Sequence, residues 1–244
     1  MKLRHDEGWT IPPDAPFYRP LPAAYRNVQM QFVFFHADPR AVDEYLPEPL
    51  EAAEDGMCVA GGIDIPESHY GAFQESFLLL KARFRGEVGF YCSHVFHNGP
   101  AGIAAGREVY GTPKIYSDVH LTIAGPMVVT ETRLDERPVL TIHSSTGEEF
   151  DGAMPSLAPA WRLKVIPRAD GPRPAVKQLI DCTDVTQDFV LRERRQGSGK
   201  IWLDHSGDLD LRPLAPTRYG KAVYQVCDYK EAFARIAYDY LTGE

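Results

Sequence analysis

The chain has 244 residues, of which 44% are hydrophobic and 25% charged, and its formal net charge is −8 at pH 7. This composition is typical of a globular protein that can bury a sizeable core. The acidic balance argues against a nucleic-acid-binding surface, which needs a basic face, but it leaves a small anionic substrate open.

No run of 18 apolar residues and no apolar leader segment occurs, which argues against a membrane span or secretion. Cys58, Cys92, Cys182 and Cys227 stand singly, in a pattern that fits neither a disulfide framework nor a zinc motif. Unpaired cysteines suit a reducing compartment. We therefore predict a cytoplasmic protein.

The first half of the chain indicates an arm, a strand and a short helix in succession. Residues 1–24 are rich in proline and indicate an extended arm, and the aromatic and β-branched residues 25–35 predict a strand. A short helix is expected next, with Asp38 as its N-cap, Pro39 at its first position and Pro47 at its end.

Short β-like runs then recur at regular spacing, separated by turn residues. They are MCVAGGIDI, SFLLLKARFR, GFYCSHVFH, YSDVHLTIAG, MVVTETR and VLTIHSS. Such spacing predicts antiparallel pairing in a sandwich or barrel, because βαβ units would need helical stretches between the strands.

The second half continues with strand-like segments. LAPAWRLKVIP predicts a strand, and residues 176–205 predict two strands around a charged loop, RRQGSGK, whose spacing does not fit a phosphate-binding loop. The chain from residue 222 predicts more strand and then a terminal helix. No linker and no internal repeat is visible, so we predict one domain over residues 1–244.

Lys114 is the first candidate for chemistry. It lies in AGIAAGREVYGTPKIY (residues 101–116), which has two turns of small residues before it. Pro113 fixes its own φ and restricts the residue before it, so Gly111–Pro113 predicts a stiff turn that aims the lysine. An amine buried beside bulky neighbours loses its proton more readily, and a neutral amine forms a Schiff base with a carbonyl carbon. The alternative is an ordinary surface lysine.

Glu75 is the second candidate. It follows a glycine turn and precedes the apolar run FLLL, so it enters a strand that is expected to be buried. A carboxylate there costs free energy unless it is paired or neutral. A carboxyl group with a raised pKa near the lysine could move the protons that Schiff-base chemistry requires. The alternative is a surface glutamate at the start of a strand.

Metal binding and serine hydrolysis are both disfavoured. Cys92, His94 and His97 offer three ligands, but strand alternation would place the first two on one face and His97 on the other. The HExxH and paired CxxC spacings are absent, so we expect histidines that pack or hydrogen-bond and no metal. No GxSxG motif occurs, and Ser144 and Ser145 lie in no nucleophile elbow.

Several segments, in order, resemble the acetoacetate decarboxylase-like superfamily. GREVYGTPK is similar to the lysine motif of that superfamily, and similar segments span residues 17–241. They are FHADPRAVDEYLPEPLE, the run ending in Glu75, WRLKVIPRADGPRP and IAYDYL. The resemblance implies a mainly β (α+β) fold, an antiparallel, cone-like closed barrel or sandwich with few peripheral helices. It also implies a catalytic pair of Lys114 and Glu75, with no cofactor.

The sequence departs from the decarboxylases at three positions. Aligned on PEPLE and on Glu75, an arginine and a second glutamate of the family fall on Val28 and Ala60, and a second lysine falls on Ile115. Arg26 lies two residues from Val28, on the same face of the expected strand, and could substitute as the carboxylate anchor. These departures resemble the non-decarboxylating branch, which condenses pyruvate-type 2-oxo acids with aldehydes and dehydrates the product, or hydrates unsaturated 2-oxo acids. In that branch the position of Tyr110 contacts substrate, although Tyr110 could equally pack under the turn.

Three functions therefore stay open. The leading hypothesis is a Schiff-base lyase that acts on 2-oxo acids and aldehydes through Lys114 and Glu75. The second is decarboxylation of acetoacetate through the same lysine, with Arg26 as the anchor. The third is a catalytically silent barrel that binds a small molecule. The proline-rich arm and the resemblance favour a homo-oligomer.

Overall fold

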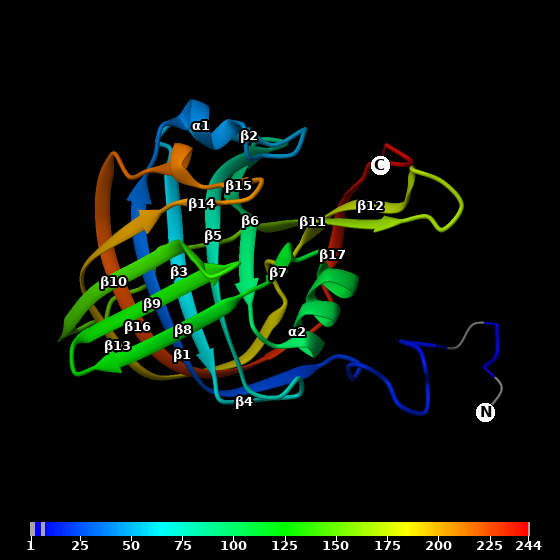
Figure 1. Cartoon of the computed structure of the whole chain (residues 1–244), viewed down its shortest axis with the longest axis horizontal. Coiled ribbons are helices and arrows are strands. Elements are labelled where there is room, and N and C mark those ends of the chain that lie inside the picture. Colours follow the sequence, from blue (N-terminus) through cyan, green and yellow to red (C-terminus); the bar gives the residue numbers. More distant parts are fainter. Residues whose placement is uncertain (1–2, 6–7, 244) are drawn as a thin grey trace.

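The strand-forming segments of the sequence join into one large sheet in the computed structural model, which describes residues 3–5 and 8–243 (Figure 1). The strands of this 15-stranded sheet are β1 (Ala23–His36), β2 (Glu51–Ala52), β3 (Met57–Ile65), β4 (Glu67–Ser68), β5 (Phe73–Phe84), β6 (Glu87–His97), β7 (Lys114–Tyr116), β8 (Asp118–Ala124), β9 (Met127–Leu134), β10 (Arg137–Glu149), β11 (Ala160–Pro167), β12 (Pro174–Asp181), β13 (Thr186–Leu203), β16 (Arg218–Glu231) and β17 (Arg235–Asp239). The prediction of a mainly β fold is confirmed.

The main path of the sheet runs β17-β12-β11-β6-β5-β3-β1-β16-β13-β10-β9-β8. Most neighbours pair antiparallel, but β6 pairs parallel with both β11 and β7. The strands β14 (His205–Ser206) and β15 (Leu209–Asp210) form a separate pair. The helical elements are short: α1 (Pro39–Asp43), α2 (Pro100–Ala105), the π-helix η1 (Gly106–Tyr110) and the 3₁₀-helix η2 (Arg212–Leu214). No helix in residues 3–5 and 8–243 is long and apolar enough to cross a bilayer.

The sheet folds over itself, so that β8, β9 and β10 cross one face of β1, β3 and β5 (Figure 1). Alternate side chains of the central strands meet this second layer in a core that includes Phe35, Leu78 and Ile142. Gln31 ties the layers together, because its Nε2 donates to Ser144 Oγ and to the Val128 carbonyl at 2.8 Å each. The other face of β1, β3 and β5 is thereby left to form a second core and a cavity.

Three sequence expectations are corrected by the strand pairing. RRQGSGK is no loop but lies inside β13, where Gly197 and Gly199 allow close approach of the neighbouring strands: a Cβ at Gly197 would lie 1.8 Å from the Ser145 carbonyl oxygen. The terminal helix is replaced by β17, which pairs with β12. The turns of small residues before Lys114 are instead α2 and η1.

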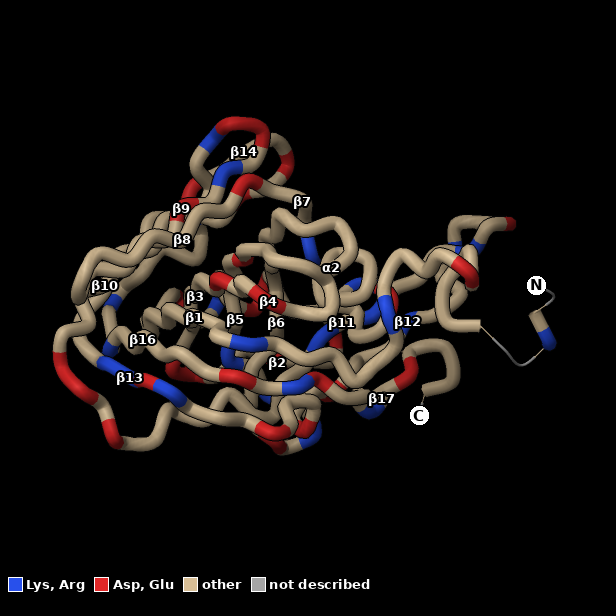
Figure 2. The backbone as a smooth tube through the Cα atoms, turned by 90° about the horizontal axis from the view of Figure 1, so that it is seen from below, with Lys and Arg blue, Asp and Glu red and all other residues tan. Residues whose placement is uncertain are grey.

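The first helix agrees with the sequence at its start. Asp38 caps α1, accepting a hydrogen bond from the Arg40 amide at 2.9 Å, and Pro39 is the first helical residue. The helix ends at Asp43, before Pro47. Figure 2 shows that Lys, Arg, Asp and Glu are interspersed over the strands and outer turns, and along β13 the two signs of charge follow one another.

Candidate active site

The segment from α2 to β7 places Lys114 at the edge of the cavity. The π-helix η1 is followed by Gly111, which has φ +71°, and a Cβ there would lie 2.3 Å from the Lys164 Cα. Only glycine fits this combination of backbone and space. The Thr112 amide then bonds the Gly106 carbonyl at 2.9 Å, and Lys114 begins β7. As expected, Gly111–Pro113 forms a tight connection that directs the lysine.

Lys114 and Glu75 meet in the cavity, as the sequence predicted for them. Lys114 Nζ lies 3.0 Å from Glu75 Oε2, and the two side chains are 12% and 15% exposed. The amine also lies 5.4 Å from the centre of the Phe73 ring. A Cβ on Gly106 would lie 2.8 Å from the Lys114 Cε, so that glycine leaves room for the lysine side chain.

The charge state of Glu75 differs from the sequence expectation. Burial has the largest influence and would raise the pKa of the carboxyl group, but the cations Lys114 and Arg162 outweigh it and bring the pKa below 4.5. The expected raised pKa is therefore wrong. Glu75 rests as a carboxylate, which makes it a proton acceptor before it is a donor.

His97 lies behind Glu75 as a neutral imidazole. Its Nδ1 accepts a hydrogen bond from the Gly99 amide at 2.7 Å, and its ring stacks on Phe73 at 4.2 Å. Burial, and then the charge of Lys114, lowers the pKa of His97 to about 4. The hydrogen bond at Nδ1 assigns the ring proton to Nε2, which faces Glu75 Oε2 at 3.7 Å.

A β-bulge on β6 overturns the expected distribution of Cys92, His94 and His97. Leu79 pairs with Cys92 and Leu78 pairs with His94, so Ser93 is an extra residue that shifts the alternation. Cys92 consequently lines the cavity and His97 lies on the same side of the sheet, against Glu75, whereas His94 lies on the opposite side, near the Tyr45 ring in the segment after α1. In the described part of the chain, no group of three His, Cys, Asp or Glu residues is placed to hold a metal ion.

Arg26 does not reach the cavity. Its side chain is 61% exposed, and its Nε lies 3.6 Å from Glu67 Oε1 at the surface. The expectation that it shares a face with Val28 is wrong, because Asn27 has φ +52° and the pairing of β1 shifts between Tyr25 and Val28. Val28 itself is buried in the core on the cavity side.

Ala60 also lies on the other face. It packs in the core between the two layers, whereas Val59 and Gly61, on either side of it along β3, face the cavity core and Phe77. A polar group at position 60 could not reach Lys114, and the two inward neighbours carry no polar side chain. The decarboxylase anchors are therefore missing from this part of the cavity wall.

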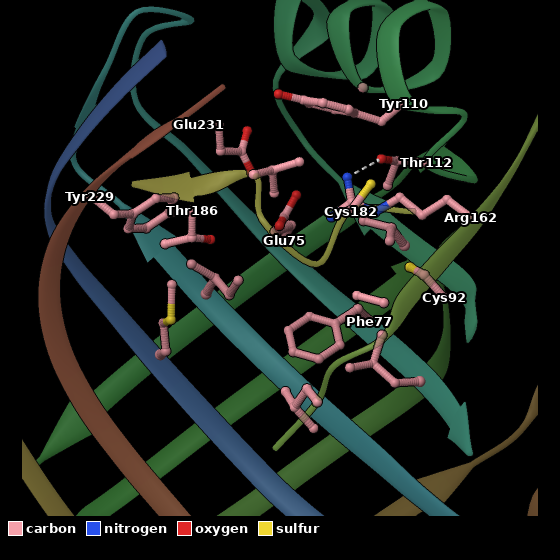
Figure 3. Close-up of a pocket in the computed structure, with 18 of the residues that line it drawn as sticks. Glu75, Phe77, Cys92, Tyr110, Thr112, Arg162, Cys182, Thr186, Tyr229 and Glu231 are labelled. Carbon is pink, nitrogen blue, oxygen red and sulfur yellow. Dashed lines mark hydrogen bonds between the residues drawn. The ribbon is translucent and has the colours of Figure 1, made fainter. Parts of the chain in front are cut away.

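Arg162, on β11, is a cavity residue that the sequence analysis missed. Its Nη1 donates to Thr112 Oγ1 at 2.9 Å, and its guanidinium lies 5.4 Å from the centre of the Tyr110 ring (Figure 3). Thr112 precedes Lys114 by two residues, so this bond holds the guanidinium beside the turn that carries the lysine. An arginine inside the apolar run WRLKVIP was the signal available in the sequence.

Tyr110 was expected either to contact substrate or to pack under the turn. It lines the cavity, and it is also fixed by packing and a hydrogen bond. Its hydroxyl donates to the Ala232 carbonyl at 2.6 Å. Glu231, at the end of β16, brings a second carboxylate to the cavity, and Tyr25 donates a hydrogen bond to its Oε2 at 2.8 Å. No motif in the sequence singles out Glu231. Figure 3 shows Glu231, Glu75, Thr112 and Arg162 around one end of the cavity, below Tyr110.

The cavity has a volume of about 440 Å³ and is mostly apolar away from these groups. Burial raises the pKa of the Cys92 thiol to about 12, so this side chain stays a protonated thiol and a poor nucleophile beside Lys114. The arrangement provides one amine, one adjacent carboxylate and one partly buried guanidinium in a space large enough for a small organic substrate.

Comparison with known proteins identifies the acetoacetate decarboxylases as similar in sequence and in fold. The family model described as acetoacetate decarboxylase matches residues 4–241. Acetoacetate decarboxylase 2 of Mesorhizobium japonicum is 29% identical, and the match covers 96% of this chain and 90% of the relative. A solved acetoacetate decarboxylase has a TM-score of 0.86 at 21% identity, covering 96% of this chain and 97% of its own.

A second kind of solved structure has the same fold. The enduracididine biosynthesis enzyme MppR, in complex with the condensation product of pyruvate and imidazole 4-carboxaldehyde, has a TM-score of 0.79 at 20% identity. That match covers 94% of this chain and 96% of MppR. At these identities the structural matches establish a common fold and leave the reaction of this chain to its own residues.

Proposed function

The chain belongs to the acetoacetate decarboxylase family, and from that premise we propose that it is a cofactor-independent Schiff-base lyase acting on small 2-oxo acids. Lys114 forms the imine with the C2 carbonyl, and Glu75 moves the protons. The observation that carries the proposal is the 3.0 Å contact between Lys114 Nζ and Glu75 Oε2 in a cavity that Arg162 also lines. Imine formation needs a nucleophile and a proton acceptor held together in this way.

Imine formation begins with proton transfer from the Lys114 ammonium to the Glu75 carboxylate. The free amine attacks C2, and Glu75 returns the proton to the carbinolamine oxygen, which leaves as water. The resulting iminium withdraws electrons from C3, whose proton passes to the Glu75 carboxylate, and an enamine forms. The lowered pKa of Glu75 means that the group starts as a carboxylate, so it is free to accept the first proton.

The enamine then reacts with an aldehyde. Its C3 bonds to the aldehyde carbon, and the aldehyde oxygen takes the proton held by Glu75. Loss of this hydroxyl as water, together with a second C3 proton, leaves a carbon–carbon double bond. Hydrolysis of the imine releases an unsaturated 2-oxo acid and restores Lys114. Hydration of an unsaturated 2-oxo acid uses the same steps in reverse.

Arg162 is the proposed anchor for the carboxylate of the 2-oxo acid. That carboxylate is attached directly to the imine carbon, so its partner must lie near Lys114. Arg162 meets this requirement, because it donates a hydrogen bond to Thr112 in the turn that precedes Lys114. A guanidinium offers two parallel donors to a carboxylate.

Decarboxylation of acetoacetate is the second candidate, favoured by the curated relatives that carry that name at 29% and 28% identity. Both candidates use Lys114. They differ in where the substrate carboxylate sits relative to the imine carbon, and so in which substrate turns over.

The test is borohydride reduction of the protein with pyruvate or acetoacetate, read by intact mass and peptide mapping. We expect pyruvate to be trapped at Lys114, and the adduct to be lost in Lys114→Ala but kept in Lys200→Ala, a change at an exposed lysine of β13. Steady release of carbon dioxide from acetoacetate on the order of 1–10³ s⁻¹ would establish the decarboxylase instead. Trapping of neither acid would leave a binding protein.

A further inference from the structure

The cavity extends well beyond the space that a 2-oxo acid needs at Lys114. Its volume of about 440 Å³ is in the range of pockets that enclose drug-sized ligands, whereas a molecule of the size of pyruvate fills a small part of it. The remaining space lies next to the point where the enamine carbon must meet its second substrate. The chemistry of its walls therefore identifies that substrate.

The strand register separates the cavity into a charged end and an apolar chamber. The row that contains Glu75 pairs it with Ile63 on β3 and with His97 on β6. Two residues further along β5, the next inward row contains Phe77, paired with Gly61 and with Val95. Phe32 on β1 pairs with Gly61 and completes this row across four strands.

The same apolar character continues one row deeper. Leu79 follows Phe77 on the inward face of β5, where it pairs with Val59 and Cys92. At about 3.3 Å per residue, the path from Glu75 to Leu79 is about 13 Å long. Figure 3 shows Phe77 on the side of Glu75 that faces away from Tyr110 and Thr112. No charged side chain of the described residues lies in these two rows of β1, β3, β5 and β6.

The two aromatic rings of the chamber, Phe77 and Phe32, have defined orientations. A Cβ on Gly61 would lie 2.1 Å from the Phe77 ring, so the glycine lets that ring lie flat against β3. The Phe32 ring meets Phe77 edge to face, with centroids 6.0 Å apart. Flat and edge-on ring surfaces favour an aromatic or aliphatic guest, and a charged or hydroxylated guest would lose its water there without gaining partners.

We propose that the second substrate is an uncharged aldehyde with an aromatic or aliphatic group, which occupies the chamber lined by Phe32, Phe77, Leu79 and Val95. This inference rests on the proposed function, and it names the substrate class of the same site. The aldehyde carbon lies beside the enamine at Lys114, its oxygen lies near Glu75, and its apolar group extends along β5. The product is then a 2-oxo acid with a conjugated apolar substituent.

The first experiment measures kcat/KM with pyruvate and a series of aldehydes, following the absorbance of the conjugated product. From acetaldehyde to butanal and hexanal we expect a rise of about threefold to fourfold for each added CH2 until the chamber is full. Benzaldehyde should be a good substrate, and glyceraldehyde and glyoxylate should be poor. A preference for glyceraldehyde or glyoxylate, or no preference, would overturn the inference.

A matched pair of variants locates the preference. Phe77→Asn places an amide in the chamber and should reduce the ratio of kcat/KM for benzaldehyde to that for acetaldehyde by at least tenfold. Val165→Asn makes a similar polar change at a side chain that is 44% exposed on β11 and should keep the ratio. An unchanged ratio in folded Phe77→Asn would contradict the assignment, and the wild-type series decides the question if that variant does not fold.

Binding of unreactive alcohols separates failure of the inference from failure of the proposed function. Benzyl alcohol should bind the wild-type protein at least tenfold more tightly than glycerol in a calorimetric titration. If pyruvate is not trapped but benzyl alcohol is preferred, the lyase proposal fails and the apolar chamber stands. If pyruvate is trapped at Lys114 but benzyl alcohol shows no preference, the chamber inference fails and the lyase proposal stands.

Discussion

At the scale of single residues, the site depends on which charged groups are inward and which are not. The sequence allowed Lys114 and Glu75 to be paired, and their 3.0 Å contact agrees with that prediction. It suggested Arg26 as the carboxylate anchor, but a left-handed residue at Asn27 turns Arg26 to the surface. Arg162 points inward because it is one of the alternate residues of β11 whose side chains face the cavity, and no motif in the sequence shows which residues those are. The lowered pKa of Glu75 likewise depends on two cations, Lys114 and Arg162, that come from separate segments, so it is visible only in the fold.

The two arginines make a direct test of the anchor. Arg162→Met should lower kcat/KM for pyruvate by about 10²-fold, because a buried charge-assisted hydrogen bond to a carboxylate contributes about 3 kcal/mol. Most of the loss should appear in KM, since the carboxylate is held before and after imine formation. Steady-state kinetics with pyruvate and an aldehyde measure both parameters.

Arg26→Met is the matched control, because its side chain is 61% exposed and contacts only Glu67 among the ion pairs of the described residues. It should change kcat/KM by less than about twofold. An Arg26→Met enzyme that is impaired while Arg162→Met is active would reverse the assignment and return the anchor to β1.

At the scale of elements, local patterns predicted the β-strands and α1 but not the segments whose structure depends on distant partners. α1 has its own cap at Asp38, so its start could be predicted. The glycines of RRQGSGK suggested a loop, yet they serve close packing between β10 and β16, which are remote in sequence. The bulge at Ser93 also has no local signature, and it separates Cys92 from His94, which were predicted to share a face.

Gly111 connects the conformation of one element to the position of the catalytic lysine. Its φ is +71° and a Cβ would contact the Lys164 backbone at 2.3 Å, so Gly111→Ala meets both backbone strain and a clash. We expect the free energy of unfolding to fall by more than the roughly 1–3 kcal/mol typical of backbone strain alone, together with slower trapping of pyruvate at Lys114. Denaturant unfolding and borohydride trapping measure the two effects.

Gly86→Ala is the control for this change. Gly86 has φ +85° in the turn between β5 and β6, and nothing lies within 4 Å of a Cβ built there. It should show the conformational cost without the clash and leave trapping unchanged. Equal effects of the two substitutions would mean that the contact with Lys164 does not position Lys114.

At the scale of the whole molecule, the fold uses one face of the central strands for a packed core and the other face for the cavity. One face of β1, β3 and β5 packs against β8–β10, and the other face lines the cavity. The mainly β class could be predicted from evenly spaced short strands. The same spacing also predicted a sandwich or barrel, but the strand order could not be predicted, because it requires pairing between segments far apart in the chain, such as β1 with β16. The predicted homo-oligomer stays a prediction, and sedimentation of the purified protein would test it.

The two buried histidines of β6 should make the whole fold sensitive to mild acid. Burial lowers the pKa of His94 to about 4, and burial with Lys114 lowers that of His97 to about 4, from an ordinary value of 6.5. As the pH falls from about 6.5 towards 4, these two histidines therefore become protonated in the unfolded chain but stay neutral in the folded protein. By linkage, stability is full above pH 6.5, and each histidine should remove about 2 kcal/mol by pH 5.

Urea unfolding at pH 7.5 and pH 5.0 measures this loss, with a constant m-value showing that the same unfolding reaction is compared. His94→Gln and His97→Gln should each remove about half of the difference between the two pH values, because each deletes one group that titrates only in the unfolded chain. His94 faces the core between the layers and His97 lies against Glu75, so similar effects from both would show that burial, rather than the charges at Lys114 and Glu75, dominates. Stability that is equal at the two pH values in the wild-type protein would contradict the neutral state assigned to His97 beside Glu75.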